Sequence, residues 1–459
     1  MTNDLVITGR VVVPGAVLDD GWIAVDGPRI AAVGQGTPPP ARARHDAPAG
    51  ALILPGVVDG QTHATSAGGL PGIDATTASA LAGGVTTIVD MPYDNPAPLS
   101  DRARLADKVA AVAAHARCDV ALYATVLPGQ DTAEVAALVE GGVCAFKISA
   151  FESSPTRFPR IPADRALDLL QALAPTHLPL GLHNEDQEIV RAATARVRAA
   201  GGNGLAEHAA ARPLAAELSA TAAFLELGAA SGGHAHVVHF STADGFDRVA
   251  ALAALGHRVT GELCVHYLWF DIADPADAAL GHRLKVNPPV RSGARDALWN
   301  AVAAGRVPFV SSDHSSWPVS AKDTASIHDA GAGVPGLETL LPAFLTGAAA
   351  RGLNAPVLAA RLLAEHPARF FGLWPRKGAL AAGADADIAV WAPGAMTWDA
   401  TRQRDDLRWS PFHGRRFDGR VLRTYLRGRL AFDGATVHAT PGTGRFLPRG
   451  PGGWFAPPA

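Results

Sequence analysis

Five polar residues stand at the ends of apolar, strand-like runs in this sequence. They are His63, Lys147, His183, His239 and Asp313. Imidazole and carboxylate groups suit a divalent cation such as zinc, and a catalytic zinc keeps one position open for water. Because water bound to such an ion ionises near neutral pH, the set predicts a metal-dependent hydrolytic site. One histidine alone would as readily be a hydrogen-bonded core residue, but burying five ionisable groups without a metal or partners is costly.

Gln61 stands where a further imidazole would be useful. It precedes His63 by two residues, and residues i and i+2 of a strand point to the same face. An amide oxygen binds hard cations but is a weak ligand for zinc. Three outcomes stay open: a weakened first metal position, a single metal held by Lys147, His183 and His239, or a pocket put to another use.

Lys147 lies inside the apolar run VCAFKISAF. Burial beside a cation disfavours its ammonium form, and the neutral amine can react with carbon dioxide to give an anionic carbamate that bridges two metals. The alternative is a lysine whose stem packs while its amine reaches water at the rim. Asp313 can both ligate a metal and carry a proton from water to the leaving nitrogen.

The middle of the chain alternates apolar strands with Ala-rich amphipathic helices. The predicted strands cover residues 53–63, 84–92, 119–126, 143–151, 179–186, 235–240, 259–268 and 307–314. Eight such units favour a (β/α)8 TIM barrel over a doubly wound sheet, because no Gly-rich phosphate loop follows the first strand. In a barrel the C-terminal strand ends share one rim, so the polar residues are expected to converge there.

Both ends of the chain consist of short alternating strands separated by Gly and Pro, with no predicted helix before residue 60. They predict a small β-sandwich domain made of residues 1–52 and 378–459, which leaves residues 53–377 for the barrel.

Composition excludes several other classes of protein. The chain has 459 residues and a net charge of −3, which gives no electrostatic reason to expect nucleic acid or a membrane surface. No window reaches the apolar length of a membrane span and the N-terminus is too polar for a signal peptide, so we expect a cytoplasmic protein. Cys118, Cys144 and Cys264 are scattered and odd in number, which argues against a disulfide framework.

Motifs in order along nearly the whole chain resemble those of the cyclic amidohydrolases, which include allantoinase, hydantoinase, dihydropyrimidinase and dihydroorotase. The matching segments are PGVVDGQTH, GGVTTIVDMP, AFKISAF, GLHNED, HVVHFS, GELCVHYL, KVNPPVR, SSDHSSWP, VPGLETLLP, KGALAAGADADIAVW and WSPFHGRRFDGRVLRTYLRG. The last two segments and the SDHS form are most similar to allantoinases.

The resemblance implies roles for the polar residues. Lys147 would become N6-carboxylysine. It would ligate a single Zn2+ ion or bridge two of them, and another divalent metal could take the place of zinc. His183 and His239 would hold the second metal, and His63 and Asp313 the first.

The resemblance also implies a reaction. A metal-bound hydroxide would hydrolyse an endocyclic amide of a five- or six-membered cyclic ureide or imide, with Asp313 as general base and acid. Asn287 in KVNPP matches a position that holds the ring through its backbone. The family is commonly dimeric or tetrameric, so a homo-oligomer is expected.

Some positions depart from the family pattern. Gln61 replaces the first histidine of a pair, Glu152 stands where hydantoinases carry a tyrosine, and Asp94 stands where allantoinases usually have Asn. Asp94 and Glu152 are therefore candidate substrate contacts. HATSAGG lacks the arginine with which dihydroorotases hold a substrate carboxylate.

Three hypotheses follow. The leading one is an allantoinase-like hydrolase of a cyclic ureide. The second is a one-metal enzyme that hydrolyses or closes another ring, such as a hydantoin or dihydropyrimidine. The third is a scaffold or assembly protein that has lost catalysis, although a scaffold has no chemical reason to keep the polar set.

Overall fold

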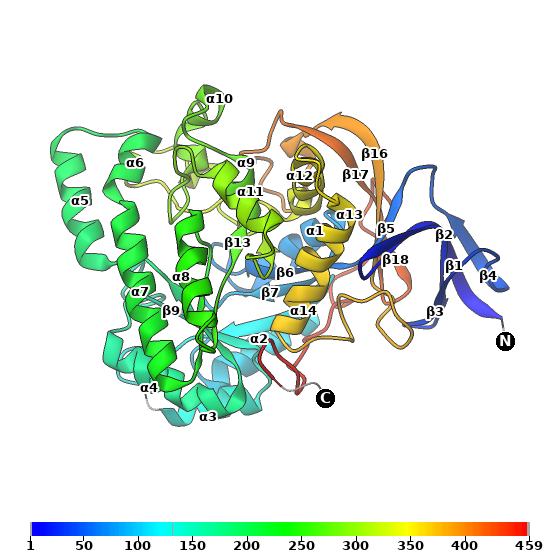
Figure 1. The fold of residues 1–459 in the computed structure, drawn as a ribbon, viewed down its shortest axis with the longest axis horizontal. Helices are drawn as coiled ribbons and strands as arrows, with labels where there is room; N and C mark the ends of the chain where they lie inside the picture. Colours follow the sequence, from blue (N-terminus) through cyan, green and yellow to red (C-terminus); the bar gives the residue numbers. More distant parts are fainter. Residues whose placement is uncertain (1, 131, 457–459) are drawn as a thin grey trace.

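The computed structural model describes residues 2–130 and 132–456, and its centre is a ring of parallel strands (Figure 1). Neighbours in the ring follow the order of the chain, and the last strand lies beside the first. The (β/α)8 barrel is therefore confirmed. Its strands are β6 (Val57–His63), β7 (Val85–Asp90), β8 (Asp119–Ala124), β9 (Ala145–Ser149), β10 (Pro179–His183), β11 (His234–Val237), β12 (Val259–Gly261) with β13 (Leu263–Cys264), and β14 (Val310–Ser311) with β15 (His314–Ser315).

Helices cover the outside of this ring (Figure 1). Three of them start at a capping aspartate: Asp101 accepts from the Arg104 amide at the start of α2, Asp186 from the Ile189 amide at the start of α5, and Asp274 from the Ala276 amide at the start of α10. The helices are α1 (Ile73–Ala82), α2 (Arg102–His115), α3 (Thr132–Glu140), α4 (Ala163–Leu173), α5 (Gln187–Ala199), α6 (Leu205–Ala211), α7 (Leu214–Ser231), α8 (Ala243–Ala253), α9 (Val265–Trp269), α10 (Pro275–Ala278), α11 (Arg295–Ala303), α12 (Leu337–Ala349), α13 (Ala355–Ala360) and α14 (His366–Phe370).

Three predicted strands are interrupted in the structure; the run at 307–314 divides into β14 and β15, with Ser312 and Asp313 between them. The run at 53–63 is divided at Gly56, whose amide donates to the Asp387 carbonyl. A Cβ at Gly56 would lie 2.2 Å from Thr86 Oγ1, so only glycine allows this close approach. The run at 259–268 leaves the strand after Cys264 and forms α9, where the Trp299 indole donates to the Leu268 carbonyl at 2.8 Å.

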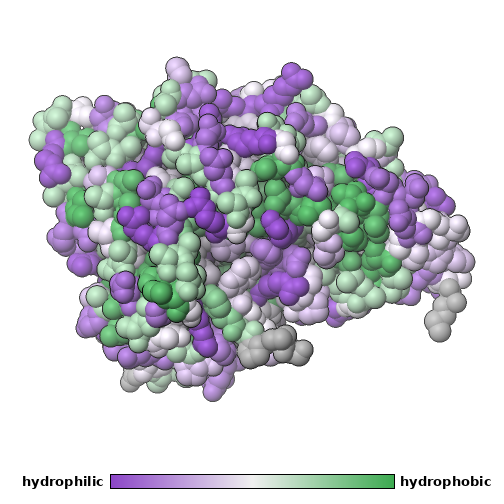
Figure 2. Space-filling model, in the orientation of Figure 1, coloured by the Kyte–Doolittle hydropathy of each residue, from purple (hydrophilic) through white to green (hydrophobic). Residues whose placement is uncertain are grey.

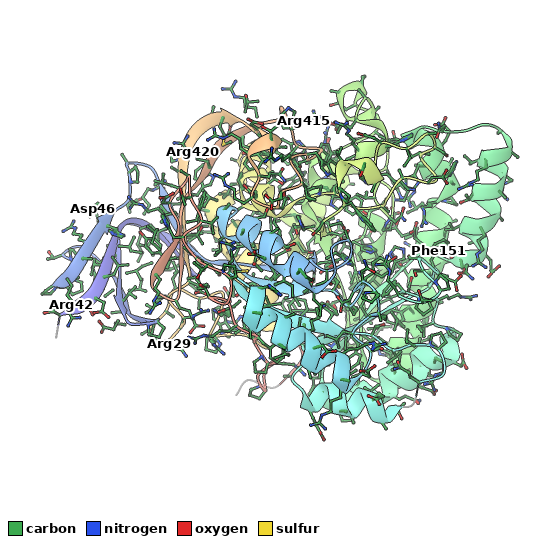
Figure 3. The ribbon with its side chains drawn as sticks, turned by 180° about the vertical axis from the view of Figure 1, so that it is seen from behind. Arg29, Arg42, Asp46, Phe151, Arg415 and Arg420 are labelled. Carbon is green, nitrogen blue, oxygen red and sulfur yellow. The ribbon has the colours of Figure 1, made fainter. Side chains whose placement is uncertain are left out.

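The two ends of the chain form a second, mostly antiparallel sheet beside the barrel (Figure 1). Its order is β18-β17-β16-β5-β1-β2-β3, with β4 paired to β1. Figure 3 places Arg42 and Asp46 on this sheet, at the opposite end of the molecule from Phe151. The strands are β1 (Asn3–Val13), β2 (Ala16–Asp26), β3 (Arg29–Gln35), β4 (Ala41–Asp46), β5 (Leu52–Pro55), β16 (Ile388–Thr397), β17 (Arg416–Leu426) and β18 (Arg429–Phe432).

The two units share packing contacts and strand pairing across their boundary. One buried cluster includes Leu52 and Trp391 of the terminal sheet together with residues of the barrel. Past the terminal sheet the chain returns to the barrel, where Leu447 is buried and its amide donates to the Val120 carbonyl. The division into residues 1–52 plus 378–459 and residues 53–377 therefore stays a prediction.

The outer surface mixes hydrophilic and hydrophobic residues. Figure 2 shows hydrophilic side chains over most of this face, with hydrophobic ones in separate groups, one of them where α13 meets the terminal sheet. Among the described residues no helix is both long enough and apolar enough to cross a membrane.

A buried ionic cluster joins the terminal sheet to the barrel. Lys377 Nζ lies 2.6 Å from Asp119 Oδ2, 2.9 Å from Asp385 Oδ2 and 2.6 Å from Asp387 Oδ2. Arg427 pairs with Asp119 from the end of β17. Burial alone would lower the pKa of Lys377, but the three carboxylates outweigh it and raise that pKa. The carboxylates could group around a cation, and the lysine ammonium serves as that cation.

Replacing Lys377 by methionine is expected to lower the free energy of unfolding by about 3–5 kcal/mol, because three buried carboxylates lose their shared partner. Urea unfolding followed by circular dichroism measures the loss. Arg10→Met is the matched control, since its pair with Asp19 is exposed and is worth at most about 1 kcal/mol. Equal effects of the two changes would contradict the structural role of the cluster.

Candidate active site

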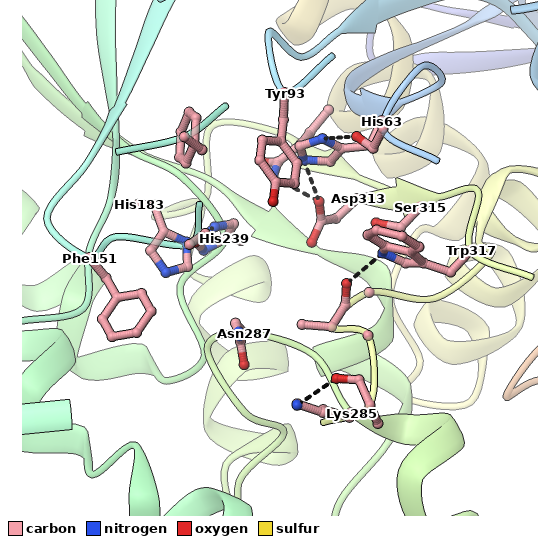
Figure 4. A pocket seen from close by; sticks show the side chains of 18 of the residues that line it. His63, Tyr93, Phe151, His183, His239, Lys285, Asn287, Asp313, Ser315 and Trp317 are labelled. Atoms are coloured by element: carbon pink, nitrogen blue, oxygen red, sulfur yellow. Dashed lines mark hydrogen bonds and ion pairs between the residues drawn. The ribbon is translucent and has the colours of Figure 1, made fainter. Parts of the chain in front are cut away.

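One cavity of about 350 Å³ opens at the C-terminal ends of the barrel strands. The five polar residues that the sequence predicts all line it, although they come from five different strands or strand ends. Figure 4 shows His63, His183, His239 and Asp313 around the pocket. Gln61 and Asn287 line it as well. The structure thus brings the predicted metal-binding set together at one rim, which is where barrel enzymes carry their active sites.

His183 and His239 form the most compact part of the site. His183 Nδ1 lies 3.0 Å from His239 Nε2, and His183 Nε2 lies 2.8 Å from Glu185 Oε2. Because a carboxylate accepts, the proton of His183 belongs on Nε2 and its Nδ1 lone pair faces His239. Burial lowers the pKa of both imidazoles, so both are neutral near pH 7. Two neutral ring nitrogens at this spacing are within reach of one cation.

Arg212 supports this histidine pair from outside. It forms a salt bridge with Glu185, and its guanidinium lies 4.6 Å from the centre of the Phe151 ring. Burial would raise the pKa of Glu185, but Arg212 and His183 outweigh it and lower that pKa to about 2. Glu185 is therefore ionised and holds the orientation of His183.

The second part of the site consists of Gln61, His63 and Asp313. Gln61 Nε2 donates to Asp313 Oδ1 at 2.9 Å, and His63 Nε2 lies 3.6 Å from the same oxygen. His63 Nδ1 contacts Ser66 Oγ at 3.2 Å. Asp313 has a positive φ of +47°, as does His239, a conformation that is uncommon for non-glycine residues.

Asp313 and Lys147 both have a pKa shifted toward neutrality. Burial raises the pKa of Asp313 to about 7, against the opposing effect of Lys147. Burial also lowers the pKa of Lys147, partly opposed by Asp313 and Glu262. Lys147 is only 3% exposed, which does not fit a lysine whose amine reaches solvent. Shifts of this kind are common at catalytic sites.

Two candidate substrate contacts lie outside the cavity lining. Asp94 Oδ1 is 2.7 Å from Lys108 Nζ, and this pair is buried. Glu152 lies nearer the surface, where Oε1 is 3.4 Å from Arg191. Each has a partner elsewhere, so the structure does not bring either to the cluster.

The cavity also contains residues that sequence reasoning missed. Arg212, Lys285 and His328 supply polar groups to its wall, and Tyr93 and Phe158 supply rings. Arg212 and His328 lie outside the strands, where no periodic pattern marks them. Glu262 is another residue that sequence reasoning missed, although it interrupts an apolar run as Lys147 does. It is fully buried, and its Oε2 lies 3.7 Å from His236 Nε2.

Comparison with known proteins identifies the family. A model of the amidohydrolase family matches residues 52–431. The chain belongs to the amidohydrolase family. It is 37% identical to an allantoinase of Rubrobacter xylanophilus over 97% of both chains, and 35% identical to a dihydroorotase of Halobacterium salinarum over 94% of this chain and 98% of that one. The structure of an L-hydantoinase (dihydropyrimidinase) from Arthrobacter aurescens matches with a TM-score of 0.92 at 29% identity, covering 98% of this chain and 100% of that chain.

The resemblance inferred from motifs is thus confirmed at the level of the family. The protein is an enzyme of a family whose relatives by name include allantoinases and hydantoinases.

Glu185→Gln is expected to reduce stability by about 3–5 kcal/mol near pH 7, because Arg212 and His183 lose a buried anion. The pKa of Glu185 is depressed, so its stabilisation is present above its unfolded pKa and is lost as pH falls toward about 2. The difference in melting temperature between variant and wild type should therefore stay constant from pH 8 to 5 and shrink in more acidic solution. A difference that grows on acidification would contradict this assignment.

Proposed function

We propose that this protein hydrolyses an endocyclic amide bond of a cyclic ureide, and that allantoin is its preferred type of ring. The observation that carries the proposal is the His183 and His239 pair, 3.0 Å apart, facing Lys147 and Asp313 across one cavity in a chain 37% identical to an allantoinase. A scaffold protein would gain nothing from such a costly buried set.

The donor set fits a divalent metal centre. His183 and His239 would hold one ion through neutral ring nitrogens, and His63, Asp313 and Gln61 would hold another. Lys147 lies in the same cavity and, as N6-carboxylysine, would supply the shared anionic oxygen ligand. Zinc suits this mixture of nitrogen and oxygen atoms, and a bound ion would acidify water and polarise the amide carbonyl.

Asp313 is the proposed proton carrier. Its buried carboxyl has a pKa near neutrality, so it can accept a proton from the attacking water and return it to the departing ring nitrogen. The hydrogen bond from Gln61 fixes one of its oxygens and leaves the other for this exchange. Asn287 lines the cavity and is proposed to hold the ring through its backbone.

Polar groups in the cavity wall favour a polar ring substituent. Lys285 Nζ donates to the carbonyls of His328 at 3.1 Å and Ala330 at 2.6 Å, which uses two of its three protons. Within the described residues no acceptor takes the third proton, which can therefore be donated to a carbonyl oxygen such as that of a ureido group. Four aromatic residues also line the cavity: Tyr93, Phe151, Phe158 and Trp317. They support the second candidate function, hydrolysis of a hydantoin with an apolar substituent.

We also propose that the enzyme is cytoplasmic and, from the family resemblance, that it assembles as a dimer or tetramer.

The substrate is tested with metal-loaded enzyme on allantoin, hydantoin, dihydrouracil and dihydroorotate. Allantoin should give the highest kcat/KM. Asp313→Asn should lower kcat by about 10²–10⁴-fold, since proton transfer loses its carrier.

The control for Asp313 is Asp107→Asn on the exposed face of α2, which should keep full activity. Absence of turnover on all four compounds by metal-loaded protein would refute the proposed function.

Lys285→Met should separate the two candidate substrates. Losing the free proton donor should raise KM for allantoin about tenfold, roughly the strength of one hydrogen bond to a charged group, and leave KM for unsubstituted hydantoin within about twofold. Lys285→Arg should restore part of the loss. An equal rise in KM for both compounds would show that Lys285 acts only by holding the segment that contains His328 and Ala330.

A further inference from the structure

Gln61 carries a buried carbonyl oxygen with no partner in the described part of the chain. The side chain is 0% exposed and lines the cavity. Its Nε2 donates to Asp313 Oδ1 at 2.9 Å, whereas its Oε1 has no hydrogen bond. Leaving a buried acceptor unsatisfied costs about 1–3 kcal/mol, so this oxygen is available to a partner in the cavity, such as a cation or a water molecule.

The hydrogen bond decides which way the amide faces. The ionised carboxylate of Asp313 only accepts, so in that state the amide NH2 points to Asp313 and Oε1 points away from it. His63 Nε2 approaches the same Asp313 oxygen at 3.6 Å, which puts the three side chains around one position. Gln61 can therefore serve a cation through Oε1 while it orients Asp313 through Nε2. A histidine at position 61 would differ, because a ring nitrogen that binds a cation has no proton left to donate to Asp313.

The two cation positions differ in their donor atoms. The position at His183 and His239 has two neutral imidazole nitrogens, one of them backed by the buried anion of Glu185. The position at Gln61, His63 and Asp313 has one imidazole nitrogen, an amide oxygen and a carboxylate oxygen. Imidazole suits zinc, whereas carbonyl and carboxylate oxygens suit harder ions such as Mn2+ and Mg2+.

We propose that the metal centre is unequal: the His183 and His239 position binds zinc tightly, and the Gln61 position binds zinc weakly and accepts a harder divalent ion. This inference rests on the metal centre of the proposed function and deepens it. It predicts an enzyme that works with one zinc and one Mn2+ or Mg2+ in each chain.

The test is equilibrium titration of metal-stripped full-length protein with Zn2+ against a chromophoric chelator, with elemental analysis of the bound metal. Wild type should bind one zinc tightly and a second at least about tenfold more weakly, a difference typical of changes around a metal site. After one equivalent of zinc, Mn2+ should bind with one equivalent visible by electron paramagnetic resonance.

Variants assign the weak position to Gln61. Gln61→His should close the gap between the two zinc affinities and let zinc displace Mn2+. Gln61→Leu should abolish the second equivalent and keep the first, which also reports that the fold is intact. Gln171→His on the exposed face of α4 is the matched control, because it adds a histidine outside the cavity and should change neither affinity.

The inference would be overturned if wild type bound two zinc ions with equal affinity, or if the difference between the two zinc affinities were unchanged in Gln61→His. Turnover of cyclic amides in either case would leave the proposed function standing. Absence of any bound metal would overturn both. If both Gln61 variants also lose the first zinc, we conclude that they do not fold. The inference is then tested by the zinc titration of wild type and by its Mn2+ binding.

Discussion

The carboxylate of Asp59 connects the last strand of the barrel to the first, and the active site depends on this connection. Asp59 Oδ1 accepts from the Ser312 amide at 2.7 Å, and Oδ2 accepts from Ser312 Oγ at 2.6 Å. The parallel pairing of β15 with β6 sets His314 opposite Thr62. Asp313 consequently lies beside Gln61 although 252 residues separate them in sequence. Without closure the barrel would have two open edges and the cavity would have no wall on this side.

Buried charges fall into two groups with different uses. Lys377 with its three aspartates, and Glu185 with Arg212, are paired at short range, so they hold elements in place. Lys147 and Asp313 have no comparable counter-ion, and burial moves their pKa values toward neutrality. Groups poised in this way change protonation state readily, which suits carbamate formation and proton transfer. The structural charges thus have a buried partner of opposite charge at short range, whereas the reactive ones do not.

Much of the fold could be predicted from the sequence because its signals are local. A polar residue ending an apolar run is visible without a structure, and the topology of a barrel then implies that such residues converge. The same reasoning placed Gln61 and His63 on one side of a strand, and both line the cavity even though the pairing of β6 with β7 shifts register between Asp59 and Thr62. It failed where neighbours override a pattern: residues after Cys264 turn into α9, and Asp94 is held by Lys108.

The sequence by itself determined the family, the barrel, and the five residues that converge, since these follow from periodicity and motif order. Only the tertiary structure decided that His183 and His239 face each other through particular ring nitrogens, and that Gln61 turns its NH2 to Asp313 and leaves its oxygen in the cavity. It also brought Arg212 and Lys285 into the wall from outside the strands. The physical reason is that ring and amide orientation are set by hydrogen bonds between distant strands and loops, and no local pattern encodes those partners.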